Sequence, residues 1–233
     1  MSFEANPSYA LQTMRFGKDQ VPVIVVDDFL ADPEALVTFA ATQARFSAPK
    51  NWYPGLRAEP LPQAYVMEAI RALHEPIGEA FGLPKEGDVN ANAYFGLATL
   101  APEALSDLQR LPHFDTANPR QVALLHYLCD APHGGTSFYR QRSTGFEAIR
   151  PERARSYYTT LESNLRAKGR PPARYMSGDD DLFEETGRVE ARFNRLVIYP
   201  SCALHSANVN VDTGLSADPR QGRLTANIFL AYR

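Results

Sequence analysis

The chain contains little cysteine and little histidine, with 2 Cys and 5 His among 233 residues. Both thiols, Cys129 and Cys202, lie beside apolar residues, where a free cysteine behaves as a small hydrophobic side chain. The sequence therefore predicts packing roles for both thiols, and a reducing cytoplasm is the expected compartment.

An excess of positive charge is also absent, because 24 Lys and Arg residues face 27 Asp and Glu residues and the formal net charge is −3. Such a chain lacks the basic field that attracts a phosphate backbone, so no nucleic-acid partner is expected. A local basic run from Arg140 to Arg155 indicates a solvated face, with an anionic substrate as the alternative. No apolar run is long enough to cross a bilayer and no secretory signal pattern occurs, so no membrane association is expected.

Length and composition favour one soluble domain over residues 1–233, since 44% hydrophobic and 22% charged residues are ordinary globular values. Residues 1–88 are expected to hold a strand at 21–26 and supporting helices at 33–43 and 63–81. The β-branched run at 21–26, the Asp-Pro-Glu start at 32–34 and the apolar spacing of three and four in the second helix indicate these elements. Residues 45–62, which include Trp52, show no period and predict a packed loop.

The sequence from residue 89 to residue 233 predicts a β core of short strands. The expected strands are 91–97, 121–128, 136–140, 195–199 and 223–230. Turn formers at 130–135 predict a hairpin between the second and third of these strands. A helical insertion is expected near 151–169, followed by a mobile rim over 170–187. The fold class is therefore α+β around a β core.

Three residues form a candidate metal-ligand set within this core. His113 and Asp115 lie two apart, so both side chains leave the same face of an extended segment, and His205 comes from another strand. Two imidazoles and one carboxylate occupy one face of an Fe(II) octahedron and leave three positions open. These hard ligands favour a metal with exchangeable positions over a structural zinc ion.

The ordered set of motifs resembles the Fe(II)- and 2-oxoglutarate-dependent dioxygenase superfamily. His113-Phe114-Asp115 looks like its HxD motif, Gly134-Gly135-Thr136-Ser137-Phe138 like its glycine turn, and Leu196–Pro200 followed by His205 like its distal-histidine segment. The resemblance implies a double-stranded β-helix, a jelly-roll or cupin-like barrel, with the helices at its amino-terminal side. The amino-terminal part is similar to the prolyl-hydroxylase-like branch, and residues 192–206 resemble an uncharacterised bacterial family within that branch.

The same resemblance implies a set of co-substrate contacts. Arg223, with Thr225 on the same strand face, matches the superfamily position that binds the far carboxylate of 2-oxoglutarate. Prolyl hydroxylases place this basic residue closer to the distal histidine, so residues 208–222 are expected to form an enlarged loop. Asn92 and Tyr94 match a hydrogen-bonding pair that some members use, with ordinary strand packing as the alternative.

The activity implied is hydroxylation of a C–H bond in a small molecule or peptide, with O2 and 2-oxoglutarate consumed and succinate and CO2 released. Two alternatives stay open on the residues alone: a cupin-type metalloenzyme that does not use 2-oxoglutarate, and a catalytically silent jelly-roll protein that binds a ligand or partner. A cupin-type enzyme would normally have more histidine ligands. The sequence leaves the primary substrate and the oligomeric state open.

Overall fold

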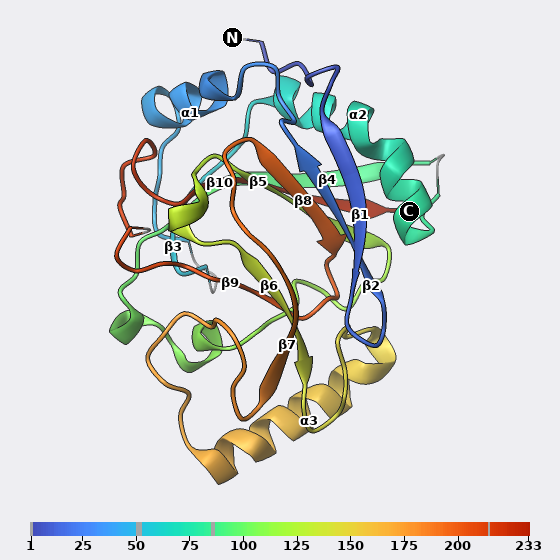
Figure 1. Cartoon of the computed structure of the whole chain (residues 1–233), viewed down its shortest axis with the longest axis vertical. Helices are drawn as coiled ribbons and strands as arrows, with labels where there is room; N and C mark the ends of the chain where they lie inside the picture. Colours follow the sequence, from blue (N-terminus) through green and yellow to red (C-terminus); the bar gives the residue numbers. More distant parts are fainter. Residues whose placement is uncertain (1, 50–52, 85–86, 214) are drawn as a thin grey trace.

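Two antiparallel sheets face each other in the computed structural model, which describes residues 2–49, 53–84, 87–213 and 215–233 (Figure 1). The large sheet has the order β1 (Ala10–Phe16), β2 (Val21–Asp27), β8 (Arg195–Pro200), β5 (Gln121–Tyr127), β10 (Leu224–Tyr232), β4 (Val89–Ala98) and β3 (Gly55–Ala58). The small sheet has the order β7 (Phe183–Val189), β6 (Thr136–Gln141) and β9 (His205–Ala207). The chain is thus a mixed α and β protein built mainly from antiparallel strands.

Helices cover the two outer faces. In Figure 1, α1 (Pro33–Thr42) and α2 (Gln63–Phe81) lie at the top against the large sheet, and α3 (Pro151–Lys168) lies at the bottom beyond the small sheet. Buried Leu36 of α1 and Leu73 of α2 pack with Ile228 of β10 in one cluster, whereas Leu161 of α3 packs with Tyr139 of β6 in another. None of the helices formed by the described residues is long and apolar enough to cross a bilayer.

The continuous apolar run of β2 reflects burial on both faces of that strand. Ile24 and Val26 point to the helices, and Val23 and Val25 point to the space between the sheets. A strand covered on both faces gains from apolar residues at every position, each worth about 1.5–3 kcal/mol when fully buried. The run therefore reads as unbroken β-branched sequence rather than as an alternating pattern.

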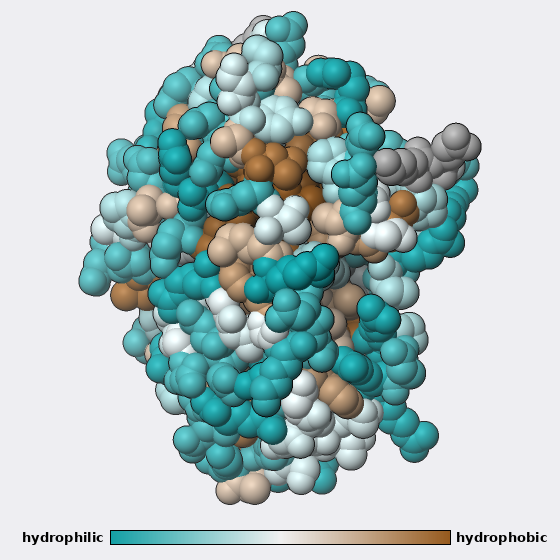
Figure 2. Space-filling model, turned by 45° about the vertical axis from the view of Figure 1, so that its right-hand side comes forward, coloured by the Kyte–Doolittle hydropathy of each residue, from teal (hydrophilic) through white to brown (hydrophobic). Residues whose placement is uncertain are grey.

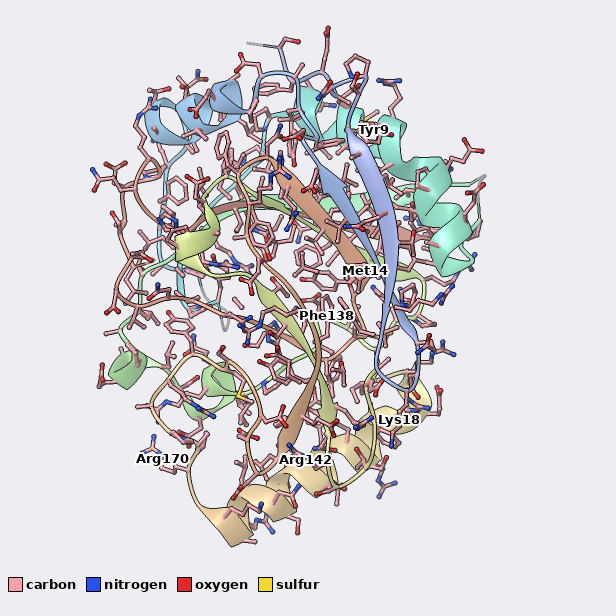
Figure 3. The ribbon with its side chains drawn as sticks, viewed as in Figure 1. Tyr9, Met14, Lys18, Phe138, Arg142 and Arg170 are labelled. Atoms are coloured by element: carbon pink, nitrogen blue, oxygen red, sulfur yellow. The ribbon has the colours of Figure 1, made fainter. Side chains whose placement is uncertain are left out.

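The space between the sheets is filled by aromatic rings together with valine and alanine side chains. Phe138, labelled in Figure 3, projects from β6 and places its ring centroid 5.3 Å from that of Tyr199 and 5.4 Å from that of Phe16. Most of the face seen in Figure 2 is hydrophilic, and apolar atoms gather in its upper middle part. The sheets therefore pack through an apolar interior of mixed aromatic and aliphatic side chains.

Both predicted amino-terminal helices are confirmed. Asp32 caps α1 by accepting a hydrogen bond from the Ala35 amide at 3.2 Å, with Pro33 in the first turn. α2 covers the predicted residues 63–81 and ends at Gly82, whose φ of 65° lies in the left-handed region.

Three predictions about connections are wrong. β5 and β6 do not form a hairpin, because β5 pairs with β8 and β10 in the large sheet while β6 pairs with β7 and β9. The segment 170–187 is not a mobile rim throughout: Met176 is 1% exposed, Phe183 is 0% exposed, and β7 begins at Phe183. The expected loop over 45–62 contains β3, while Trp52 lies outside the described residues.

Candidate metal centre between the two sheets

His113, Asp115 and His205 meet where the chain passes beside β9. An isolated antiparallel bridge joins His113 to His205, with N–H to carbonyl distances of 2.9 and 2.8 Å in the two directions. The Asp115 amide donates to the carbonyl of Ser201 at 2.8 Å. Backbone hydrogen bonds therefore fix the segment that carries the first two ligands against the strand that carries the third.

The three side chains can contact one ion. Nε2 of His113 lies 4.0 Å from Oδ1 of Asp115, and Nε2 of His205 lies 3.9 Å from the same oxygen. Their ligand atoms all lie within 4.8 Å of one another, and no other group of three or more His, Cys, Asp or Glu in the described ranges meets this criterion. The structure thus brings together the ligand set that the sequence predicts.

His205 is oriented by its other ring nitrogen. Nδ1 lies 2.9 Å from the carbonyl oxygen of Ala203, so Nδ1–H donates and Nε2 keeps its lone pair facing Asp115. Metal-binding histidines are commonly oriented in this way. The ring packs on Tyr199 at 4.7 Å between centroids, and 6% of its side chain is exposed. The donor set and the tautomer both suit a divalent metal ion.

Burial shapes the electrostatics of the cluster. It lowers the pKa of His205 to about 4 and raises the pKa of Asp115 to about 6, while the charges of His113 and Arg57 act to lower the latter. Protein packed around the cleft, together with His205, lowers the pKa of His113 to about 4. The side chain of His113 is 57% exposed, whereas that of His205 is 6% exposed. Both imidazoles are neutral at pH 7, as metal ligands must be.

Phe114 anchors the ligand segment to the helical insertion. Its ring lies 5.7 Å from Tyr157 and 5.8 Å from Tyr158, both on α3. Alternation along the extended segment sends Phe114 away from its two neighbours, so one residue packs while the others face the cleft. The helix predicted at 151–169 therefore packs against the segment that carries His113 and Asp115.

Arg223 and Thr225 also face the interior, on the side of β10 opposite the helices. Arg223 is 3% exposed and donates from Nε to the Gly134 carbonyl at 3.2 Å and from Nη2 to the Gly135 carbonyl at 2.9 Å. Thr225 is hydrogen-bonded to Tyr53. Burial raises the pKa of Tyr53, and the positive charge of Arg223 acts to lower it. The structure therefore shows Arg223 holding the glycine turn, a role that the sequence did not predict.

Asn92 and Tyr94 share the inward face of β4 and line a pocket of about 360 Å³ with Asp115. Tyr94 stacks on Phe229 of β10 at 5.8 Å between ring centroids. The pocket also contains Arg57 of β3 and Gln121 of β5, which the sequence did not single out. β3 spans four residues without a clear apolar period, so no sequence pattern could have located Arg57.

The remaining histidines lie away from the cluster. His126 is completely buried among the helices, where Nδ1 lies 3.0 Å from the Tyr65 hydroxyl and Nε2 lies 3.1 Å from Oδ1 of Asn194. His126 is therefore a core histidine whose two ring nitrogens both have hydrogen-bond partners. Nε2 of His133 lies 2.9 Å from the Gln221 carbonyl oxygen and Nδ1 lies 3.3 Å from that of Asp130, while His74 stacks on Tyr232.

Fold and site define a two-sheet protein with a two-histidine, one-carboxylate cluster at the mouth of its interior. The chain belongs to the family of unknown function DUF6445, whose profile matches residues 7–230. No curated protein matches the chain.

Three solved structures show similarity to the chain at low identity. HygX from Streptomyces hygroscopicus, with nickel and 2-oxoglutarate bound, is 14% identical over 92% of this chain and 84% of its own, with a TM-score of 0.49. AviO1 from Streptomyces viridochromogenes Tue57 is 15% identical over 99% and 90%, with a TM-score of 0.44. An N-substituted L-amino acid dioxygenase from Burkholderia ambifaria AMMD is 12% identical over 97% and 94%, with a TM-score of 0.43.

Proposed function

We propose that the protein is an Fe(II)- and 2-oxoglutarate-dependent dioxygenase that hydroxylates a C–H bond of a small molecule or peptide. The observation that carries this proposal is the cluster of His113, Asp115 and His205, whose ligand atoms lie within 4.8 Å of one another. Three protein ligands leave an octahedral ion with open positions, which a co-substrate and dioxygen require. Bound metal and 2-oxoglutarate would together supply the oxidative decarboxylation that drives hydroxylation.

The strand arrangement supports a double-stranded β-helix. The large sheet has β4, β10, β5 and β8 side by side, while the segment at His113 pairs beside β9, and β9, β6 and β7 follow in that order. Apart from β6 and β7, which are neighbours in the small sheet, consecutive core strands thus alternate between two facing sheets, as in a jelly roll. The same alternation explains why β5 and β6 do not form a hairpin.

A buried cation supports the choice of 2-oxoglutarate. Arg223 lies in the interior that also contains the metal cluster, and Tyr199 is within electrostatic range of both Asp115 and Arg223. We assign Arg223 and Thr225 to the far carboxylate of 2-oxoglutarate, because a guanidinium binds a carboxylate through a planar fork. Asn92 and Tyr94, on the neighbouring strand β4 and the same face of the large sheet, are assigned as further hydrogen-bond donors. A cupin-type site is less favoured, since only two histidines reach the cluster among the described residues.

The protein's own groups have defined tasks in this proposal. His205 is held in one tautomer by Ala203, and Asp115 supplies the negative charge that the metal requires. The rings of Tyr199 and Phe138 form an apolar wall on the interior side of the cluster. Halogenation would require a halide on the metal in place of a carboxylate ligand. Asp115 supplies that carboxylate, so hydroxylation is the proposed outcome.

Anaerobic visible spectroscopy tests the proposal. Addition of Fe(II) and 2-oxoglutarate to the folded wild-type protein should produce a metal-to-ligand charge-transfer band, and Arg223→Gln should weaken 2-oxoglutarate binding about tenfold or more with metal affinity retained. Arg166→Gln, which removes an exposed arginine of α3, serves as the control and should leave the band unchanged. Absence of the band in folded wild type would refute the use of 2-oxoglutarate.

A further inference from the structure

Arg57 is a cation held rigidly beside the candidate metal centre. It lies on β3, opposite Gly96 of β4, and its guanidinium carbon is 3.8 Å from the centroid of the Tyr94 ring and 4.9 Å from that of Tyr53. Contacts of this kind are favourable cation–π interactions. A long side chain that is otherwise flexible is therefore fixed against two aromatic rings.

The guanidinium of Arg57 lies in the same pocket as Asp115 but forms no ion pair with a carboxylate of the described residues. Arg57 takes part in none of the ion pairs formed by the described part of the chain, and its Nε atom is shielded from solvent without a hydrogen-bond partner. By contrast, Arg195 pairs with Asp27, and Arg142 with Asp179. A desolvated N–H of a charged group is costly without an acceptor, so the position of Arg57 favours a ligand that supplies one.

The basic run at 140–155 is a poorer candidate for binding an anion. Arg140 already contacts Glu147 and Glu184, and Arg153 lies 3.0 Å from Asp19. The positive charges of Arg140 and Arg153 are therefore compensated within the protein. These two arginines offer less to an anion than Arg57 does.

Arg57 and the candidate metal ligand Asp115 line the same pocket. The pocket has a volume of about 360 Å³, and the residues that line it include Arg57, Asp115, Asn92 and Gln121. The charged groups of this lining are Arg57 and Asp115, and the nearby Glu59 is exposed and acts electrostatically on Tyr94. In the proposed enzyme the charge of Asp115 is committed to the metal, which leaves Arg57 to attract an anion.

We propose that Arg57 binds a carboxylate of the primary substrate and thereby determines its chemical class. This inference rests on the proposed function. One guanidinium balances one negative charge, which suits a monoanionic carboxylate better than a phosphate dianion. Asn92 and Gln121 offer amide groups to the rest of the molecule. The substrate class is therefore a small carboxylic acid oxidised at a carbon near the metal.

Paramagnetic NMR with a matched pair of probes tests this assignment. The protein is loaded with Mn(II) and 2-oxoglutarate, and the methyl-proton relaxation of 4-methylpentanoate is compared with that of 4-methylpentanamide. The pair differs only in the charged group, and relaxation reports proximity to the metal without turnover. Wild type, Arg57→Gln and Arg57→Lys are compared, with Arg142→Gln as a control. Arg142, labelled in Figure 3, is ion-paired with Asp179 and is not among the residues that line the pocket.

Wild type and Arg142→Gln should bind the acid about tenfold or more tightly than the amide, because a charge-assisted hydrogen bond is lost in the amide. Arg57→Gln should lose the preference for the acid but keep 2-oxoglutarate binding. Arg57→Lys should keep part of the preference for the acid. Equal binding of acid and amide by wild type, including no binding of either, overturns the assignment, as does an unchanged preference in Arg57→Gln. Loss of 2-oxoglutarate from Arg57→Gln would make Arg57 the co-substrate anchor instead. Failure of wild type to bind Mn(II) or 2-oxoglutarate would reject the proposed function itself.

Discussion

His126 provides a quantitative test of the buried polar network between the large sheet and the helices. The ring is fully buried, and burial lowers its pKa to about 4, while hydrogen bonding to Asn194 acts in the opposite direction. Its neutral ring donates from Nε2 to Asn194 and accepts from the Tyr65 hydroxyl at Nδ1. Protonation would place a second donor against Tyr65 and a charge in an apolar core.

The sign and size of the pH effect follow from linkage. An unfolded histidine titrates near pH 6.5, so between that pH and about 4 the unfolded state binds more protons and stability falls as the pH falls. Above pH 6.5 both states are neutral at His126, and its contribution no longer changes. From pH 7.5 to pH 5 this one group should lower the free energy of unfolding by about 2 kcal/mol.

Urea denaturation of metal-free wild type and His126→Gln, measured at several pH values from 7.5 to 5, isolates this contribution. Gln can donate to Asn194 and accept from Tyr65 but does not titrate, so the variant should be less stable at pH 7.5 and lose about 2 kcal/mol less on acidification. Groups that titrate in both proteins, such as Asp27, cancel in the comparison. Parallel curves for the two proteins would refute a buried neutral histidine at this position.

Three further predictions concern the parts that surround the site. Glu147→Ala should lower the free energy of unfolding by about 3 kcal/mol in urea denaturation, because the buried carboxylate accepts from the amides of Lys18 and Asp19 at 2.9 and 2.8 Å; a loss below 1 kcal/mol would contradict this role. Gly135→Ala should destabilise by about 2 kcal/mol or more, since an added Cβ would lie 2.1 Å from the Val189 carbonyl oxygen, and an unchanged thermal midpoint would refute the close approach. Asp115→Ala should weaken Mn(II) binding ~100-fold or more by calorimetry while the metal-free protein keeps its stability, with Asp181→Ala as an exposed control; global unfolding would instead indicate a structural metal.

The elements that the sequence predicts well are those whose pattern comes from burial. β2 reads as an apolar run because both faces are covered, and β10 alternates because Leu224 and Ile228 face the helices while Thr225 faces the small sheet. The His113 and Asp115 pair is likewise local, since a spacing of two fixes a shared face. These features need no knowledge of which strand lies beside which.

The features that the sequence misses depend on long-range pairing. β7 contains the segment Glu184-Glu185-Thr186-Gly187-Arg188, which has no apolar alternation, and pairing with β6 makes it a strand. Arg57 lies on the short edge strand β3, and only its pairing with β4 brings it to Tyr94. The alternation of the last strand predicts that Arg223 faces inward. Its hydrogen bonds to Gly134 and Gly135 could not be predicted, because the turn that carries these glycines is distant in the sequence.

Anomalous diffraction from crystals loaded anaerobically with Fe(II) and 2-oxoglutarate tests the central claim most directly. A single iron peak bonded to imidazole nitrogens of His113 and His205 and to a carboxylate oxygen of Asp115 is predicted, with 2-oxoglutarate at the same ion and its far carboxylate at Arg223. Iron bound elsewhere, or no iron at these three residues in a folded protein, would contradict the account.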